Sequence, residues 1–299
     1  MNRSFGDYIA TDLYAVIQAH RAIADMGDKE KVSALLLDGP PGTGKTFLAR
    51  TMARYLDAKL LHFQFFPGCG RGDLLWDITD GRQGGKREDG IVLRALRMSR
   101  EGKVVLLLDE LDKAAVEVDS FLLNFLNEGH VYVRGEDLVE ADRGNLIVCI
   151  TKNDQRGASH ALLRRCRCVL MDWPSIETET AIMRKLVPSL TDQACAVLLE
   201  IPTRLRRNPE VLKPPSTPEI CRAVADLLEL VARGCRHDIL GEYYVSCLCP
   251  LPEDRRWVEK SPAYVGLSVR EALQEIAPDS SRVADSPLSG ILTTMLEGT

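Results

Sequence analysis

The chain has 299 residues, 45% of them hydrophobic and 27% charged, with a formal charge of −5. This composition is typical of a globular protein and excludes a disordered or fibrous one. The length predicts about two domains and excludes a disulfide-stapled miniprotein. The mild negative charge argues against a protein that coats nucleic acid through bulk charge.

Cysteine usage and hydropathy indicate the compartment. Nine cysteines, an odd number, are scattered without regular spacing, and the first residues lack the apolar segment of a signal peptide. The longest apolar runs, such as 104–108 and 146–150, are far shorter than the roughly 20 residues needed to cross a bilayer. We therefore expect a cytoplasmic protein that has no membrane contact.

Hydrophobic periodicity predicts helices and strands along the first half of the chain. Residues 8–26 carry apolar side chains at helical spacing without Gly or Pro, so residues 1–30 are expected to supply an N-terminal helix. Continuous apolar runs then alternate with helix-like segments, at 34–38, 60–66, 104–109, 146–151 and 168–172. Such alternation indicates a parallel sheet covered on both faces, and it predicts an α/β domain over residues 31–173.

Helical patterns without strands follow from Pro174, which predicts a small all-α domain over residues 174–235. Beyond Gly234 prolines interrupt the pattern, and only 268–277 keeps helical spacing, so 236–299 is an extension of uncertain fold. Two glycine-rich stretches, 67–73 and 80–90, are expected to form loops. The basic stretch 204–207 is expected to be a solvated face, the alternative being contact with nucleic acid or an acidic partner.

A phosphate-binding loop follows the first predicted strand and precedes a predicted helix. Its glycines allow successive N–H groups to turn toward a phosphate, and the helix directs its positive end to the same place. We expect Lys45 to contact the β and γ phosphates and the Thr46 hydroxyl to bind Mg²⁺. The residues expected to hold the nucleotide are Gly39, Pro40, Pro41, Gly42, Thr43, Gly44, Lys45, Thr46 and Phe47.

Two adjacent carboxylates end the apolar run at 104–108. Asp109 is expected to support Mg²⁺. Glu110 is expected to polarise the attacking water, since a carboxylate beside the metal that does not coordinate it can accept the proton. The alternative is an acidic pair that caps the following helix.

These motifs resemble those of AAA+ ATPases, and within them the MoxR group with its dynein-like and McrB-like relatives. The resemblance rests on Walker A, GPPGTGKT, and Walker B, VVLLLDELDKA, supported by VDSFLLNFLNEG, LIVCITKND, ALLRRCR and LKPPSTPE over about residues 30–235. It implies a five-stranded parallel sheet of order 5-1-4-3-2 followed by a helical lid. It also implies ATP and Mg²⁺ as cofactors, and an ATP site completed by a neighbouring subunit.

The resemblance assigns further catalytic residues. Asn153 is similar to the sensor 1 residue, which holds the attacking water together with the Walker B glutamate; Thr151 is the alternative. Arg164 and Arg165 lie where the family places the arginine finger, with Arg165 preferred. A cation supplied by a neighbour in this way raises turnover by about 10³ to 10⁵.

Sensor 2 departs from the family pattern. Pro218 occupies a position where related sequences have Arg or Ser, and proline has no side-chain donor. Arg222, one turn further, is the candidate for this cofactor-binding role, and the alternative is a plain surface or packing arginine.

Two segments resemble insertions of the MoxR branch, at 72–80 and at 130–145, the second of which has the alternation of a β-hairpin with a turn at 135–137. Trp76, Tyr132 or Arg134 are expected either to contact a partner or to pack within these insertions.

The resemblance implies an ATPase that acts as a hexameric ring on a protein client, as a MoxR-type chaperone beside a partner with a von Willebrand A domain. The competing interpretation is a McrB-like motor of a nucleic-acid restriction complex, which prefers GTP in some forms. The net charge favours the first. A third interpretation, a nucleotide-gated subunit with little hydrolysis, needs a missing catalytic group, whereas Lys45, Asp109, Glu110 and Asn153 are all present.

Overall fold

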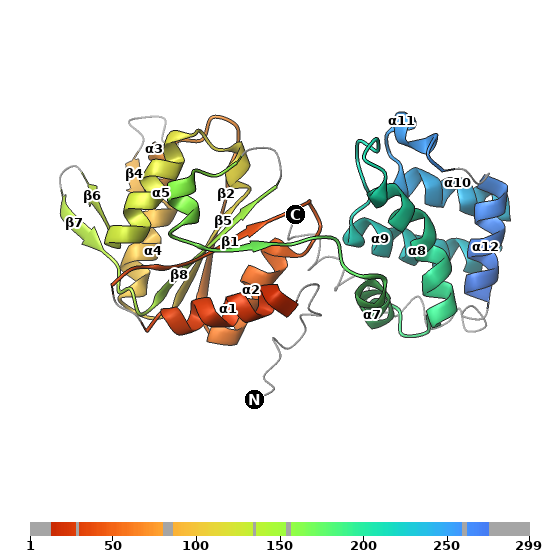
Figure 1. The fold of residues 1–299 in the computed structure, drawn as a ribbon, viewed down its shortest axis with the longest axis horizontal. Coiled ribbons are helices and arrows are strands. Elements are labelled where there is room, and N and C mark those ends of the chain that lie inside the picture. Colours follow the sequence, from red (N-terminus) through yellow and green to blue (C-terminus); the bar gives the residue numbers. More distant parts are fainter. Residues whose placement is uncertain are drawn as a thin grey trace. The chain divides into compact units, whose positions relative to one another are not determined.

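The computed structural model describes residues 13–27, 30–79, 86–133, 136–153, 157–258 and 262–274. The chain divides into two compact units, Met1–Trp173 and Pro174–Thr299. The first unit is built of strands and helices and the second of helices (Figure 1). Within these ranges no helix has the length and apolarity that a membrane span requires.

A five-stranded parallel sheet forms the centre of the first unit. Its strands are β1 (Ser33–Asp38), β2 (Lys59–Gln64), β5 (Val104–Asp109), β8 (Leu146–Lys152) and β9 (Arg167–Leu170). The spatial order β2-β5-β8-β1-β9 is the predicted order 5-1-4-3-2, counted over these five strands. β5 and β8 are buried along their whole length, which explains why they have no polar alternation.

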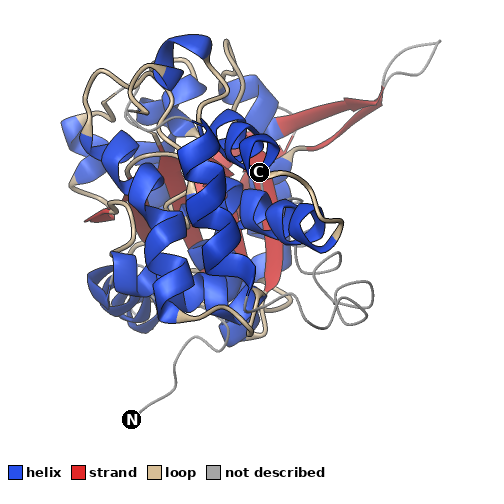
Figure 2. Ribbon diagram, turned by 90° about the vertical axis from the view of Figure 1, so that its right-hand side faces the viewer, coloured by secondary structure: helices blue, strands red, loops and turns tan. Residues whose placement is uncertain are grey.

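Helices cover both faces of this sheet (Figures 1 and 2). α1 (Leu13–Asp25) and α2 (Lys45–Leu56) pack on one face, and α4 (Ile91–Ser99) and α5 (Glu117–Glu128) pack on the other. Neighbouring residues of β1 therefore enter different cores, because successive strand side chains point to opposite faces. The predicted N-terminal helix is observed from Leu13, and its first predicted residues lie outside the described ranges.

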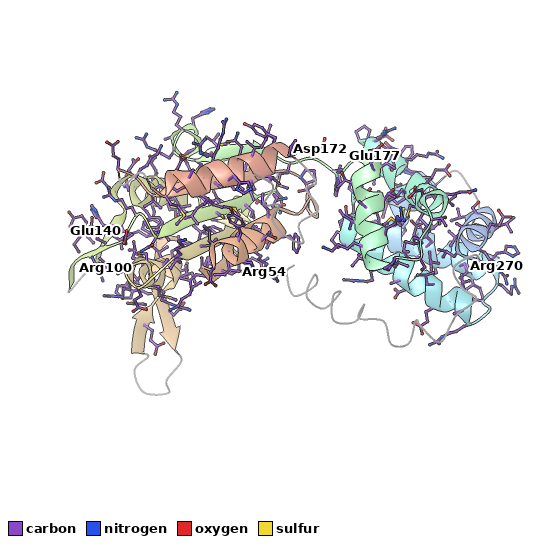
Figure 3. The ribbon with its side chains drawn as sticks, turned by 90° about the horizontal axis from the view of Figure 1, so that it is seen from below. Arg54, Arg100, Glu140, Asp172, Glu177 and Arg270 are labelled. Atoms are coloured by element: carbon purple, nitrogen blue, oxygen red, sulfur yellow. The ribbon has the colours of Figure 1, made fainter. Side chains whose placement is uncertain are left out.

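Two hairpins interrupt the alternation of strands and helices. The first insertion consists of α3 (Arg71–Leu75) and β3 (Trp76–Thr79), and β3 pairs with β4 (Lys86–Asp89). The expectation of a loop is therefore wrong for residues 71–73, which belong to α3, and for residues 86–89, where pairing with β3 overrides the local signal from glycine. This hairpin stands out from the unit (Figure 3).

The second hairpin consists of β6 (His130–Val133) and β7 (Glu136–Glu140). Arg100, just after α4, donates from Nε to the carbonyl oxygen of Glu140 at 2.9 Å and ties β7 to that helix (Figure 3). Tyr132 is 70% exposed, whereas Trp76 of the first hairpin packs against the core. Arg134 lies outside the described residues.

The second unit contains more helix than the sequence predicted. Its helices are α7 (Ile176–Leu186), α8 (Asp192–Arg207), α9 (Thr217–Ala232), α10 (His237–Leu248), α11 (Pro252–Arg255) and α12 (Pro262–Gln274). The expectation of a single helix beyond Gly234 is wrong. Pro252 and Pro262 stand at the first helical positions of α11 and α12, where the missing N–H is tolerated, and all but the short α11 contribute to one apolar core.

Arg206 of the basic stretch is buried in this unit. Its guanidinium donates to Glu179 Oε2 at 2.8 Å and to the carbonyl oxygen of Pro215 at 2.7 Å. The side chains of Arg206 and Glu179 are only 5% and 1% exposed. The expectation of a solvated face is therefore wrong at Arg206, since a carboxylate 27 residues earlier in the chain lies opposite it.

Candidate active site

The loop between β1 and α2 is shaped by glycines at both ends. Gly39 has φ 148°, and a Cβ at this position would lie 1.9 Å from the carbonyl oxygen of Met171, so no larger residue fits. Gly44 caps α2 in the left-handed region, with φ 92°. The backbone thus curls over the N-terminus of a twelve-residue helix, where N–H groups have no helical acceptor and favour an anion.

Lys45, the first residue of α2, lies inside this loop. Its ammonium donates to the carbonyl oxygens of Gly39 at 2.6 Å and Pro40 at 2.7 Å, and the residue is 6% exposed. Burial lowers the pKa of Lys45 to about 8, against the opposing influence of the Asp109 and Asp38 carboxylates. The loop therefore holds a buried amine whose proton is released near pH 8.

A hydroxyl and a carboxylate meet at the start of α2. The Thr46 hydroxyl lies 3.1 Å from both carboxylate oxygens of Asp109, at the end of β5. Thr151 of β8 also donates to Asp109 Oδ1, and His62 Nε2 lies 3.2 Å from Oδ2. Hard oxygens of this kind suit Mg²⁺, which is commonly held by one or two side chains together with the phosphates of the substrate.

The Asp109 carboxylate is held in its charged form. Burial alone raises its pKa, but hydrogen bonds from His62, Thr151 and Thr46 outweigh burial and leave the pKa below its usual value. An ionised carboxylate is the form that a divalent cation requires. The Thr46 hydroxyl and the ionised Asp109 carboxylate thus lie close enough together, and carry the right charge, to hold Mg²⁺.

Glu110 adopts a strained backbone conformation beside this pair. Its φ of 61° and ψ of 49° lie in the left-handed region, which costs about 1–3 kcal/mol for a residue other than glycine. Its N–H donates to Thr151 Oγ1 at 3.0 Å. Its Oε2 accepts from Gln64 Nε2 at 2.7 Å and from Lys113 Nζ at 2.6 Å. The carboxylate is thereby fixed at one oxygen, and Oε1 is the atom that can accept a proton from water.

The end of β8 brings the predicted sensor residue to the same edge of the sheet. Asn153 follows directly after β8, is 9% exposed, and donates from its backbone N–H to Asp112 Oδ1 at 2.8 Å. Since β5 and β8 are parallel neighbours, their carboxyl ends place Asp109, Glu110 and Asn153 together. The structure therefore unites the P-loop, the carboxylate pair and Asn153.

The predicted finger residues lie apart from this cluster in sequence and are exposed. Arg164 and Arg165 follow α6 (His160–Leu163) and are exposed, and neither guanidinium forms an ion pair with any residue that the structure describes. Ser159 caps α6, and its N–H donates to Asp119 Oδ2 at 2.6 Å. This contact holds the segment firmly on α5 while leaving both arginines accessible.

Arg222, the sensor 2 candidate, belongs to α9 of the second unit and is exposed. Its role stays a prediction.

Sequence reasoning missed the residues that support the catalytic groups. Asp112 and Lys113 stand inside the Walker B string, whereas His62 and Gln64 belong to β2, one of the two edge strands of the sheet. A signal existed for the second pair, because polar residues alternate with apolar ones along β2. The partners of these side chains depend on strand order, which is a tertiary property.

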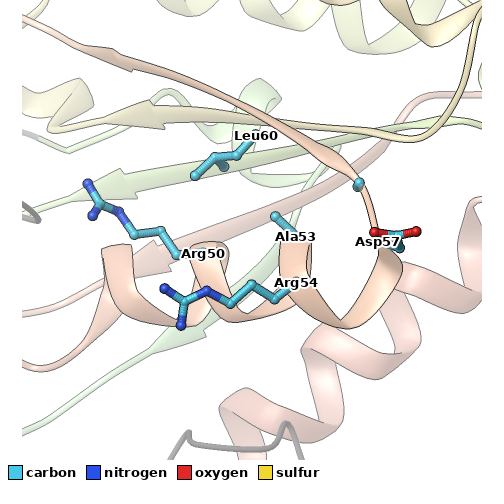
Figure 4. A pocket seen from close by; sticks show the side chains of 6 residues that line it. Arg50, Ala53, Arg54, Asp57 and Leu60 are labelled. Carbon is cyan, nitrogen blue, oxygen red and sulfur yellow. The ribbon is translucent and has the colours of Figure 1, made fainter. Parts of the chain in front are cut away.

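An open groove of about 380 Å³ lies at the opposite end of α2 (Figure 4). Arg50, Arg54 and Asp57 line it together with Leu60 at the start of β2. It contains no P-loop residue and no residue of the carboxylate pair, so it is separate from the candidate active site.

Comparisons with known proteins agree with this geometry. Residues 34–166 match the family model of the AAA domain (dynein-related subfamily). A Lon protease of Leptospira interrogans is 31% identical over 172 residues, which cover 55% of this chain and 20% of Lon. A probable ClpB chaperone of Chlorobaculum tepidum is 34% identical over 37% of this chain and 26% of its own length.

A sliding-clamp-loader large subunit of Escherichia phage RB69 is 25% identical over 58% of this chain and 47% of its own length. The chain thus spans about a fifth of the length of the Lon proteases it matches. The family match and the fold together make this part of the chain similar to the nucleotide-binding domain of AAA+ ATPases, which supports the resemblance at that level. The MoxR group within it stays a prediction.

Proposed function

We propose that this chain is an ATP-hydrolysing AAA+ remodelling motor of the MoxR type, which acts as a hexameric ring on a protein client beside a partner with a von Willebrand A domain. The convergence of Lys45, Thr46 and Asp109 on the mouth of the P-loop carries the nucleotide part of this proposal. The client part is supported by relatives whose names describe a protease and a chaperone.

The site residues divide the work of hydrolysis. Backbone N–H groups and Lys45 bind the phosphates, and Thr46 and Asp109 hold Mg²⁺, which when bound neutralises phosphate charge. Glu110 accepts a proton from water as the water oxygen attacks the γ phosphorus and the bond to the β-phosphate oxygen breaks, releasing ADP and phosphate. Asn153 orients that water.

A neighbouring subunit completes the site in this proposal. Arg164 and Arg165 are exposed and make no ion pair within the described ranges, so either guanidinium can meet a phosphate on another chain without breaking an ion pair in those ranges. The finger role of Arg165 predicts that isolated subunits hydrolyse slowly and that turnover rises with assembly.

The test begins with a Glu110→Gln variant, which is expected to bind ATP and retain it. Glu101→Gln is the matched control, because it makes the same chemical change at a carboxylate that is 73% exposed. Hydrolysis by the wild type and by Glu101→Gln, together with nucleotide binding without turnover by Glu110→Gln, is the expected pattern. Equal turnover in all three proteins contradicts the assignment of Glu110.

The same variant identifies the client. Proteins retained from native extract by Glu110→Gln with ATP, but not with ADP, are identified by mass spectrometry. Recovery of a von Willebrand A protein or of a metalloenzyme supports the MoxR-type function. Recovery of a nuclease or of nucleic acid, with a preference for GTP over ATP, supports the McrB-like alternative, for which a clamp-loader subunit among the relatives is the supporting observation.

A further inference from the structure

The short turn after Glu110 carries a second buried carboxylate. Asp112 lies in the 3₁₀ turn Leu111–Lys113 (η1) and is 8% exposed. Its Oδ1 accepts the backbone N–H of Asn153 at 2.8 Å. Its Oδ2 is fully buried and has no hydrogen-bond partner among the residues described. A carboxylate in this position is unfavourable for stability, since burial penalises a charge that is only half satisfied.

The position of Asp112 is explained by the end of the strand ladder. β5 and β8 pair residue by residue up to Leu108 and Ile150, after which the chain turns away from β8. The next N–H groups of β8 therefore lose a backbone acceptor on that side. The Asp112 carboxylate replaces that acceptor for Asn153.

A reciprocal contact lies beside it. The Thr151 hydroxyl of β8 accepts the backbone N–H of Glu110, and Asp112 of the turn accepts the backbone N–H of Asn153. Each of the two segments thus uses a side chain to fix the backbone of a predicted catalytic residue on the other. Two such contacts, two residues apart on each segment, hold Glu110 and Asn153 in one fixed relation.

We propose that Asp112 is a positioning residue for hydrolysis, which fixes the backbone of Asn153 so that its amide and the Glu110 carboxylate hold the same water. This rests on the proposed ATPase function. A small displacement of a catalytic group is expected to lower turnover by about 10- to 100-fold without changing ground-state binding.

The test compares three variants of the full-length chain. Asp112→Asn keeps an acceptor oxygen at the position of Oδ1, whereas Asp112→Ala and the nearly isosteric Asp112→Leu remove it. We expect kcat to stay within about threefold of the wild type in Asp112→Asn and to fall about 10- to 100-fold in the other two, with the nucleotide Kd unchanged in all. Asp112→Leu keeps the test available if Asp112→Ala does not fold.

A double-mutant cycle separates positioning from packing. If Asp112 acts through Asn153, adding Asp112→Leu to Asn153→Ala lowers kcat no further. A second loss as large as the first, or a parallel loss of nucleotide binding and thermal stability, overturns the proposal. Absence of hydrolysis by the wild type overturns the proposed function and this role together, whereas hydrolysis with additive losses overturns this role alone.

Discussion

The lowered pKa of Lys45 predicts that nucleotide affinity falls above pH 8. The ammonium, not the neutral amine, attracts phosphate, and burial lowers its pKa from 10.5 to about 8. Deprotonation as pH rises through 8 therefore removes the charge that binds the nucleotide. A terminal phosphate is already ionised at about pH 7.5, so the lysine is the group that titrates above this pH.

The size of the effect depends on the protonated fraction. If only the charged form binds, the apparent Kd is multiplied by one plus the ratio of neutral to charged lysine. For a pKa of about 8 the Kd rises about eightfold between pH 7.5 and 9, a loss of about 1.2 kcal/mol of binding free energy. A lysine with its ordinary pKa of 10.5 gives almost no change over the same range.

The assay is equilibrium binding of a fluorescent ADP at constant free Mg²⁺, from about pH 7.5 to 9. The control is Lys45→Arg, whose guanidinium stays charged and whose Kd is expected to be flat with pH. Asp109→Asn removes a charge that raises the pKa of Lys45, and is expected to move the rise in Kd to lower pH. A flat wild-type profile shows that Lys45 keeps its charge up to pH 9 and refutes the lowered pKa.

Three further predictions concern separate parts of the chain. Gly39→Ala should abolish nucleotide binding and lower the melting temperature, because its Cβ would lie 1.9 Å from the Met171 carbonyl oxygen; unchanged binding contradicts that contact. Arg206→Met should lower the free energy of unfolding of the second unit by about 3–5 kcal/mol in urea denaturation, because it leaves the Glu179 carboxylate buried without its cation. The double change with Glu179→Leu should recover most of that loss, and an equal loss in the double variant argues against the pair. Arg165→Ala should lower kcat by about 10³ or more with unchanged nucleotide Kd, and unchanged turnover removes the finger assignment.

The sheet could be predicted from the sequence because its strands are buried on both faces. β1, β5 and β8 are continuous apolar runs, and such runs separated by helices specify a parallel sheet. The resemblance to AAA+ ATPases supplied the strand order. The hairpin strand β4 could not be predicted, since its residues, Lys86 to Asp89, are all charged. They form a strand because they pair with β3.

The second unit shows a different limit of sequence reasoning. Prolines after Gly234 were interpreted as helix breaks, although proline is also favoured at the first position of a helix. Whether a proline ends one element or begins another depends on the tertiary packing of the residues after it. In this chain the segments after Pro252 and Pro262 are helical, and α12 packs against α10 in the same core as α8 and α9.

The candidate site divides in the same way into residues that motifs reveal and residues that tertiary structure reveals. Lys45, Thr46, Asp109 and Glu110 contact the substrate or the metal in the proposal. They form two pairs of sequence neighbours, each within a recognisable motif, although the contact between Thr46 and Asp109 joins residues 63 apart. The groups that hold them come from other strands, as Gln64 does for Glu110 across the β2–β5 pair.

The residues that hold Glu110 act on one of its two carboxylate oxygens. Gln64 and Lys113 donate to the same oxygen of the Glu110 carboxylate, and one of them is a cation. These two donors fix the orientation of the Glu110 carboxylate through one oxygen. In the proposed mechanism the other oxygen faces the attacking water, and Asn153 and a neighbour's arginine stabilise that water and the phosphate charge.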